Sequence, residues 1–320
     1  MKEFLQSIVD SVRSIFSYNI ETTNTYNVPA RDDAGLTFSR DQIKRGKLIK
    51  TCVLFIDIRN STKMSRDLAH DKIKLGKIYS AFIHAMTTIA DRHGYVRNII
   101  GDRIMVVFEP NNCFEEAMSC ASTMITIAQK VLAKYSGLTE FEVGIGVDFG
   151  EALILKTGLA KKHEDRSEYK SLVWIGDVAN IASKLTDLAN KKYTSHSYNI
   201  TYKQLRLTFA PPVLGQGLRR IPVNRDVTET LSQSDFDEHI QINNIDDIKY
   251  NIHKVIAIKK SARKISVSPI LISGHVYEGI KGTSIYKKFF SLTDYPDNGL
   301  SGIKIYGGNF YKTAIDDVKI

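Results

Sequence analysis

The sequence predicts an α+β fold in which helices cover one face of an antiparallel sheet, in a ferredoxin-like arrangement. Runs with strand character and runs with helical periodicity follow one another in the order β-α-β-β-α-β from residue 53 to residue 191. A Gly-Asp turn separates the two middle strands. The chain has 320 residues, of which 43% are hydrophobic and 25% charged, enough for one large domain or two small ones. This order of elements is that of a helix-on-sheet sandwich.

The chain begins with a predicted amphipathic helix and a linker, which together occupy residues 1–45. Residues 21–35 are polar and contain Asn, Thr, Pro and Gly, as linkers do. The polar face of the helix carries charges of both signs, which favours packing on its own domain or on a second subunit over lying on a membrane surface. The apolar residues that repeat at helical spacing are Phe4, Leu5, Ile8, Val9, Val12, Ile15 and Phe16.

The core elements come next along the chain. Residues 53–58 predict a strand, and residues 62–92 predict a long helix that Gly94 ends. The stretch YVRNIIGDRIMVVFEP predicts a hairpin that turns at its Gly-Asp pair. A second helix is expected over residues 114–135, where apolar residues again follow the helical period.

The second half of the chain adds further strands and an insertion. FEVGIGVDFGEALIL predicts a strand or hairpin with glycine breaks, and VWIGDVANIASKLTDLANK predicts a strand, a turn and a helix. Residues 191–264 are polar, contain Pro211-Pro212 and the acidic patch SDFDEHIQINNIDD, and predict an irregular insertion with some structure of its own. SPILISGHVYEGI then predicts a strand entering a helix, and GIKIYGGNFYK a final strand or hairpin. One domain therefore covers residues 46–320.

Charge and cysteine content narrow the classes of partner and compartment. The net charge of +9 suits polyanionic partners such as nucleoside triphosphates, but the basic residues are scattered and form no nucleic-acid motif. We therefore expect no nucleic acid as a partner. The three cysteines show neither a disulfide framework nor metal-ligand spacing, which is typical of reduced thiols in a cytoplasmic protein. No apolar run is long enough for a membrane span, and none resembles a signal peptide.

Asp57 is the most informative single position, because it lies between Ile56 and Ile58 in a strand that otherwise has the composition of a buried core. A buried charge needs a partner. In a β-α-β-β core the end of the first strand lies beside the turn between the second and third, so we expect Asp57 to face Asp102. Two adjacent carboxylates repel unless one is protonated or a cation lies between them. Such hard oxygen ligands suit Mg²⁺ or Mn²⁺ holding a phosphate substrate, although solvated turn aspartates remain the alternative.

The polar residues after Asp57 fit the same hypothesis. Asn60, Ser61 and Thr62 open the predicted helix, whose N-terminal amides form a natural phosphate site. A plain N-cap without a ligand is the alternative. A third polar group stands later in the chain, where Gly176-Asp177 is followed by Asn180 and Lys184.

Four segments, taken together, resemble the catalytic domain of the class III nucleotidyl cyclases. FIDIRNST is similar to the first metal motif of this family, and YVRNIIGDRIMVVF to the second, which has Gly-Asp in a hairpin. VGIGVDFGEALIL resembles the Gly-Ile-Gly strand, and WIGDVANIASKL resembles the Gly-x-x-Val-Asn-x-Ala-Ser-Arg motif. The segments span residues 53–185 in the family's order, and SPILISGHVY carries the likeness past the insertion.

The resemblance implies a metal-assisted cyclisation of a nucleoside triphosphate. Two divalent ions, Mn²⁺ or Mg²⁺, would bind Asp57, Asp102 and the backbone carbonyl of Ile58. The family also implies a homodimer with active sites at its interface, in which Asn180 of the second subunit orients the ribose. Lys184 stands where the family has a transition-state arginine, and a lysine neutralises charge without the bidentate fork of a guanidinium. Lys184 therefore either suffices, is assisted by another cation, or is an ordinary exposed helix lysine.

The base-reading positions carry neither of the purine codes of the family. These positions hold Asn98 and Val173, while Phe55 and Arg97 are expected to adjoin the base. The loss of both purine-reading residues resembles the pyrimidine cyclases of bacterial Pycsar antiphage systems, which make cyclic UMP or cyclic CMP for a separate effector protein. We expect UTP as the substrate, a preference that rests on family frequency. The alternatives are CTP, an adenylate or guanylate cyclase with an atypical pocket, and a non-catalytic nucleotide-binding sensor.

Overall fold

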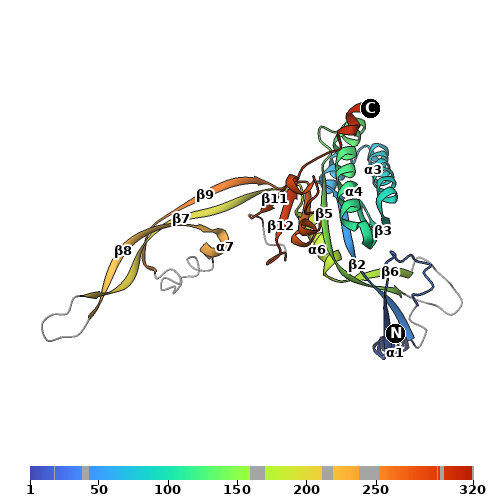
Figure 1. Cartoon of the computed structure of the whole chain (residues 1–320), viewed down its shortest axis with the longest axis horizontal. Coiled ribbons are helices and arrows are strands. Elements are labelled where there is room, and N and C mark those ends of the chain that lie inside the picture. Colours follow the sequence, from blue (N-terminus) through green and yellow to red (C-terminus); the bar gives the residue numbers. More distant parts are fainter. Residues whose placement is uncertain are drawn as a thin grey trace. The chain divides into compact units, whose positions relative to one another are not determined.

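The structure is a computed structural model that describes residues 1–17, 19–37, 43–158, 170–210, 219–237, 252–293, 295 and 299–318. It divides into two compact units (Figure 1). The first comprises Met1–Lys191 and Val267–Ile320, and the second comprises Lys192–Ser266. The second unit interrupts the sequence of the first, so both ends of the chain belong to one unit.

A nine-stranded sheet forms the centre of the first unit, in the order β11-β12-β10-β5-β2-β4-β3 with β1 on β2 and β6 on β5. Its two longest strands, β2 (Ile43–Ile58) and β5 (Val143–Gly158), pair antiparallel from Lys47 opposite Ile154 to Ile58 opposite Val143. Strands of a central sheet are covered on both faces, so β2 has a continuous apolar run. The other strands are β1 (Asn19–Asn24), β3 (Tyr95–Ile100), β4 (Arg103–Val107), β6 (Lys170–Ile175), β10 (Ile270–Ser273), β11 (Phe289–Leu292) and β12 (Ile305–Gly308).

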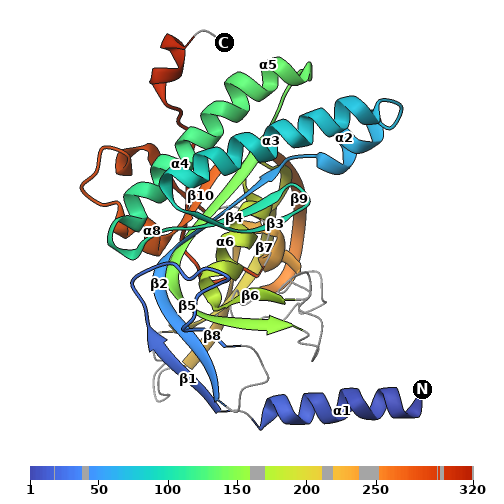
Figure 2. The same cartoon turned by 90° about the vertical axis from the view of Figure 1, so that its right-hand side faces the viewer.

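The helices α3 (Lys72–His93) and α4 (Cys113–Ile127) lie side by side on one face of this sheet (Figure 2). Their apolar residues join Leu54 and Ile56 of β2 in the larger buried cluster. The α+β class and the antiparallel ferredoxin-like core predicted from the sequence are thereby confirmed. The remaining helical segments of this unit are α1 (Lys2–Phe16), α2 (Ser61–Asp67), α5 (Ala133–Ser136), α6 (Asp177–Leu188), α8 (Gly274–Gly279), the π turn Ala128–Leu132, and the 3-10 turns Pro110–Asn112, Tyr286–Lys288 and Thr313–Asp317.

One helix differs from the expectation that all helices share a face. The apolar residues of α6 join Val53 and Phe55 of β2, which alternate with Leu54 and Ile56 and so point to the opposite side of the sheet. Gly146 of β5 makes this close packing possible, because a Cβ there would lie 2.3 Å from the carbonyl oxygen of Ala182. The Gly-Ile-Gly strand is thus the surface on which α6 lies.

Several boundaries also differ from the predictions. The long helix expected over residues 62–92 is divided into α2 and α3, because the Asp71 side chain accepts a hydrogen bond from the Lys74 amide (2.9 Å) and starts a new helix. The predicted linker contains β1, which pairs in parallel with β2, so the sheet begins at Asn19, and β2 begins at Ile43, before the predicted start of the domain. FEVGIGVDFGEALIL forms one continuous strand, β5, and not a hairpin.

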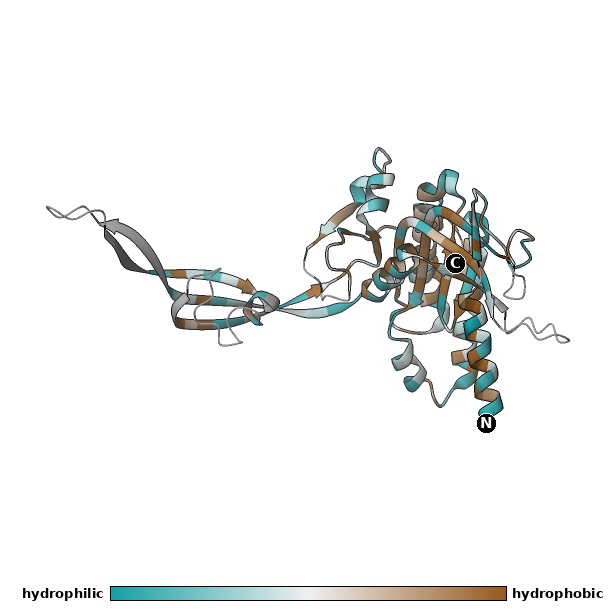
Figure 3. Ribbon diagram, turned by 90° about the horizontal axis from the view of Figure 1, so that it is seen from below, coloured by the Kyte–Doolittle hydropathy of each residue, from teal (hydrophilic) through white to brown (hydrophobic). Residues whose placement is uncertain are grey.

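The helix α1 is exposed along its whole length, and none of its residues is buried. Its apolar residues form a stripe between polar ones, from Ile8 at 44% exposure to Phe16 at 86% (Figure 3). Within the described part of the chain, no helix is both long and apolar enough to cross a bilayer.

The second unit is a three-stranded antiparallel sheet in the order β8-β7-β9. Its strands β7 (Lys192–Ala210), β8 (Arg219–Ser232) and β9 (Ile252–Ser266) are long, and a short helix, α7 (Gln233–Phe236), follows β8. The described residues are therefore regular, whereas an irregular insertion was expected. Tyr198 stacks on Phe236 with ring centroids 3.8 Å apart, within a small apolar cluster of the unit. Pro211-Pro212 and most of the acidic patch lie outside the described residues.

Candidate active site

The carboxylates of Asp57 and Asp102 meet at one end of the central sheet. Asp57 lies near the end of β2, and Asp102 lies in the turn between β3 and β4, where Gly101 has a φ of +62°. Pairing of β2 with β4 brings this turn beside Asp57. The backbone amide of Ile58 donates a hydrogen bond to Asp102 Oδ2 (3.2 Å), which ties the turn to the strand end. The structure thus brings together three of the residues predicted to bind metal ions.

The electrostatics of this pair are those of two crowded carboxylates. Burial, together with the hydrogen bond and negative charge of Asp57, raises the pKa of Asp102 above its ordinary value. The Asp57 side chain is only 18% exposed. A bound cation would relieve the repulsion and favour the ionised form of both groups.

Two arginines also contact Asp57. Arg103 Nη2 donates to Asp57 Oδ2 (2.7 Å) and to Asp187, and Arg103 Nη1 donates to Ser183 Oγ (3.1 Å). Arg59 Nη2 lies 3.3 Å from the same Asp57 oxygen, and burial lowers the pKa of Arg59. Sequence reasoning missed both arginines. The available signal was that each one directly follows a predicted metal-binding segment, in FIDIR and in GDR.

The residues present fit a divalent metal ion. Magnesium is usually bound through one or two carboxylates, with substrate phosphates and water as its other ligands. Asp57 and Asp102 can provide the carboxylates, and the carbonyl group of Ile58 can provide a further oxygen. The described residues contain no group of three or more His, Cys, Asp or Glu side chains that could form an all-protein cage. The donor set is therefore suited to an ion that arrives with a phosphate ligand.

The predicted phosphate-binding residues follow Asp57 closely in the sequence. Asn60 is the N-cap of α2 in a left-handed conformation (φ +58°), and its side chain makes no capping hydrogen bond. Ser61 and Thr62 form the first turn of α2. A pocket of about 380 Å³ borders Asn60, with Ile58 and Lys63 also in its lining, whereas Ser61 and Thr62 do not line it.

Phe55 and Asn98 share one face of the sheet, which is the face that α6 covers. Phe55 pairs with Met105 of β4, and Met105 pairs with Asn98 of β3, so the three side chains line up across adjacent strands. Arg97 is occupied elsewhere, because its guanidinium donates to the carbonyl oxygen of Val28 (3.3 Å). The structure therefore places Asn98 and Phe55 on the same face of the sheet with Met105 between them, and it gives Arg97 a structural contact.

The structure does not bring Val173 into this group within one subunit. Val173 of β6 pairs with Leu155, far along β5 from Gly146, which is the residue opposite Phe55. At ~3.3 Å per residue, the nine positions from Gly146 to Leu155 correspond to roughly 30 Å along the strand.

Asn180 and Lys184 lie on α6, one turn apart and on the same side of the helix. Lys184 Nζ donates to the carbonyl oxygen of Gly299 (3.0 Å), and Asn180 is exposed. In the described part of the chain, neither residue makes a hydrogen bond or an ion pair with Asp57 or Asp102. Their helical neighbours Ser183 and Asp187 are the residues of α6 that reach the aspartates, through Arg103.

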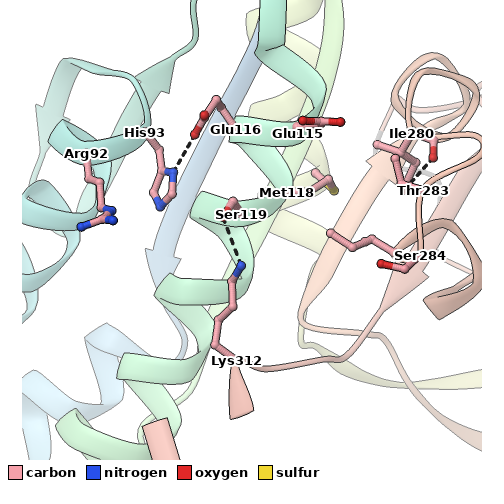
Figure 4. A pocket seen from close by; sticks show the side chains of 11 residues that line it. Arg92, His93, Glu115, Glu116, Met118, Ser119, Ile280, Thr283, Ser284 and Lys312 are labelled. Atoms are coloured by element: carbon pink, nitrogen blue, oxygen red, sulfur yellow. Dashed lines mark hydrogen bonds and ion pairs between the residues drawn. The ribbon is translucent and has the colours of Figure 1, made fainter. Parts of the chain in front are cut away.

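A second pocket, of about 690 Å³, lies between the end of α3, the start of α4 and the segment after α8 (Figure 4). His93 Nδ1 lies 2.7 Å from Glu116, and Lys312 Nζ donates to Ser119 Oγ (3.1 Å). No predicted site residue lines this pocket, so we assign the candidate active site to the Asp57–Asp102 end of the sheet.

Residues 44–210, which make up just over half of the chain, match the family of adenylate and guanylate cyclase catalytic domains. The chain therefore belongs to this family and carries a nucleotidyl cyclase domain. Enzymes with this domain are in general dependent on divalent metal ions, which agrees with the oxygen ligands at the end of β2.

Individual relatives refine the comparison. The chain is 32% identical over 201 residues to a uridylate cyclase from Gulbenkiania mobilis, covering 59% of this chain and 73% of that protein. It is 32% identical over 110 residues to a cytidylate cyclase from Staphylococcus aureus, covering 31% of this chain and 25% of that protein. The structure of a bacterial light-regulated adenylyl cyclase has the same fold, with a TM-score of 0.51, 14% identity, and coverage of 98% of this chain and 65% of that one.

Proposed function

We propose that the protein is a pyrimidine nucleotide cyclase that converts UTP to cyclic UMP and pyrophosphate. The observation that carries this proposal is the paired carboxylates of Asp57 and Asp102 beside a base-reading strand that presents the amide of Asn98. An uncharged amide with one acceptor and two donors can match the edge of a pyrimidine. The likeness to a uridylate cyclase over most of that protein's length supports UTP.

The chain's own residues would divide the work as follows. Asp57, Asp102 and the Ile58 carbonyl group would hold two divalent ions, Mn²⁺ or Mg²⁺. Such ions, when bound, lower the pKa of the ribose 3′-hydroxyl and neutralise phosphate charge. The amides at Asn60, Ser61 and Thr62 would receive the phosphates, which a helix N-terminus favours.

The groups on α6 would act on the ribose and on the reacting phosphate. Asn180 would orient the ribose, so that its 3′-oxygen attacks the α-phosphate in line and pyrophosphate leaves. Lys184 would neutralise the charge that develops on the α-phosphate. Because neither residue contacts the aspartates of its own subunit, we propose a homodimer in which each active site takes Asp57 and Asp102 from one subunit and Asn180 and Lys184 from the other. Val173 would then act from the subunit that supplies Asn180.

Cyclic CMP formation from CTP is the second candidate. It is favoured by the amide of Asn98, which can serve either pyrimidine because it both donates and accepts hydrogen bonds. The partial likeness to a cytidylate cyclase points the same way over a shorter stretch.

Separate incubations with UTP, CTP, ATP and GTP in the presence of Mn²⁺ test the proposal. We expect cyclic UMP as the main product, and we expect the Asp57→Ala and Asp102→Ala variants to form none. Conversion of ATP or GTP alone would select an ordinary purine cyclase. Nucleotide binding without turnover of any of the four would indicate a sensor.

The cellular role that we propose is the production of a second messenger in antiphage defence. The product would act on a separate effector protein, as in the Pycsar systems that the chain resembles. All three cysteines are free and buried, which supports a cytoplasmic location. Expression of the chain together with an effector protein that responds to cyclic UMP should protect bacteria from phage, and the Asp57→Ala variant should remove that protection.

A further inference from the structure

We propose that Arg103 is a catalytic residue that binds the phosphates of the nucleotide, acting from the same subunit as Asp57 and Asp102. This inference rests on the proposed function, because it concerns the same nucleotide site. Its basis is the position of the Arg103 guanidinium beside the carboxylates and the way in which α6 holds it there.

The register of the sheet places Arg103 beside Asp57. Ile56 of β2 lies opposite Ile104 of β4, so the next residues along, Asp57 and Arg103, are cross-strand neighbours. The 2.7 Å bond from Arg103 Nη2 to Asp57 Oδ2 follows from this arrangement. A phosphate held at the two aspartates therefore lies next to this guanidinium.

The two arginines that contact Asp57 differ in access to solvent. The Arg59 side chain is 7% exposed and the Arg103 side chain is 27% exposed. Arg59 is enclosed by the chain, since a Cβ on Gly144 would lie 2.9 Å from its Nε, and its Nη1 donates to the backbone of Asp187. Arg59 is thus placed to remain as the permanent counter-charge of Asp57, while Arg103 is the arginine that a ligand can reach.

Two residues of α6 keep the Arg103 guanidinium at this place when Asp57 takes another partner. Ser183 and Asp187 are four residues apart, so they share one side of the helix, and both accept hydrogen bonds from Arg103. When Asp57 engages a cation, these two bonds can hold the side chain in position. The hydrogen bonds to Ser183, Asp57 and Asp187 use three of the five N–H donors of the guanidinium, whose fork matches phosphate oxygens.

This assignment gives the site a guanidinium although Lys184 stands where the family has an arginine. A lysine provides charge without the bidentate geometry that an arginine offers to a phosphate. Arg103 supplies a guanidinium from the subunit that carries the aspartates, directly beside Asp57. Its natural targets are the oxygens of the triphosphate, whose negative charge increases on the leaving pyrophosphate as the bond to the α-phosphate breaks.

Binding of inorganic triphosphate tests this role without involving the base or turnover. Titration calorimetry with triphosphate and Mn²⁺ should show at least about tenfold weaker binding to the Arg103→Ala variant, as expected for the loss of charged hydrogen bonds. The Arg103→Lys variant should lie between, since it keeps the charge and loses the fork. Arg92→Ala, which removes an exposed arginine at the end of α3, is the matched control and should bind as the parent protein does.

A second readout separates phosphate binding from support of Asp57. Binding of Mn²⁺ alone, measured by electron paramagnetic resonance, should be unchanged or tighter in Arg103→Ala, because the arginine no longer competes for the Asp57 carboxylate. Unchanged triphosphate affinity would overturn the proposal, and so would an equal loss of affinity for Mn²⁺ alone. If Arg103→Ala does not fold, the Arg103→Lys variant decides on the same two readouts. Because triphosphate carries no base, these results are independent of whether UTP is the substrate.

Discussion

The two faces of β2 bury different kinds of residue. Leu54 and Ile56 point toward α3 and α4 and belong to a large cluster of apolar side chains. Val53 and Phe55 point toward α6 and belong to a smaller cluster, and the next residue on that side is Asp57. The apolar face can bury nearly all of its surface, whereas the other ends in charged groups that must stay accessible to a ligand. The difference indicates that one face supplies most of the folding free energy, and it agrees with our proposal that the other supplies the chemistry.

Substitution of Asp102 should have the largest effect, because it should change activity and stability in opposite directions. Asp102→Asn should lower cyclase activity by about 100-fold or more, because it removes a charged group that we propose as a metal ligand. Without metal the same change should stabilise the fold, because the raised pKa means that the ionised carboxylate costs stability as the pH rises above the ordinary range of aspartate. Thermal unfolding with a chelator, at pH 4 and pH 7, checks the sign. A lower melting temperature for Asp102→Asn at pH 7 would contradict this account.

Phe82 tests the opposite face. Its side chain is fully buried in the cluster beneath α3, so Phe82→Ala should reduce the free energy of unfolding by ~3–5 kcal/mol. Activity per folded molecule at low temperature should stay near that of the parent protein, because among the described residues no hydrogen bond or ion pair joins a proposed site residue to Phe82. Urea unfolding measures the free energy of unfolding, and an active-site titration with a rate measurement gives the activity per folded molecule. A large loss of activity under conditions where the variant is fully folded would show that the apolar face also contributes to the reaction.

Gly146 should affect both stability and activity, because it sets the distance between β5 and α6. Gly146→Ala should cost ~1–3 kcal/mol of stability through overpacking against the α6 backbone. It should also reduce kcat, because α6 carries Ser183 and Asp187 as well as Asn180. The matched change Gly76→Ala lies in α3 in open space, so it should leave kcat unaffected and slightly favour the helix. Equal kcat values for both variants would indicate that the placement of α6 does not matter to the reaction.

The smallest expected effect is an increase in kcat when Lys184 is replaced by arginine. Lys184→Arg restores the guanidinium that the family has at this position, so kcat should rise by about threefold to tenfold. Initial-rate measurements with saturating nucleotide check the direction. A lower kcat would show that the site is built around the lysine and its contact with Gly299.

Much of the site was predictable from the sequence because its parts are local. The hairpin that contains Asp102 connects neighbouring strands, so its position beside Asp57 follows from the order of elements alone. Arg59 and Arg103 were not predictable as site residues, since an arginine at a strand end or turn usually points into solvent. Their burial depends on α6, and the packing of α6 on the second face depends on Gly146, which no periodicity reveals.

The long, regular strands of the second unit were not predicted, although an insertion with some structure of its own was expected over residues 191–264. Strand β7 alternates Tyr198, Ile200 and Tyr202 with polar residues, a period-two pattern that lies inside a segment rich in charge. Its small apolar cluster is formed by residues distant in sequence, and the polar surroundings conceal it.

The ratio of kcat/KM for UTP to that for CTP, ATP and GTP, measured with Mn²⁺ on the full chain, tests the central claim most directly. Product identity should be established by mass spectrometry, with the Asp57→Ala variant as the control. The account predicts the highest kcat/KM for UTP, with cyclic UMP and pyrophosphate formed in equal amounts and neither formed by the variant. A higher kcat/KM for ATP or GTP, or formation of cyclic nucleotide by Asp57→Ala, would contradict it.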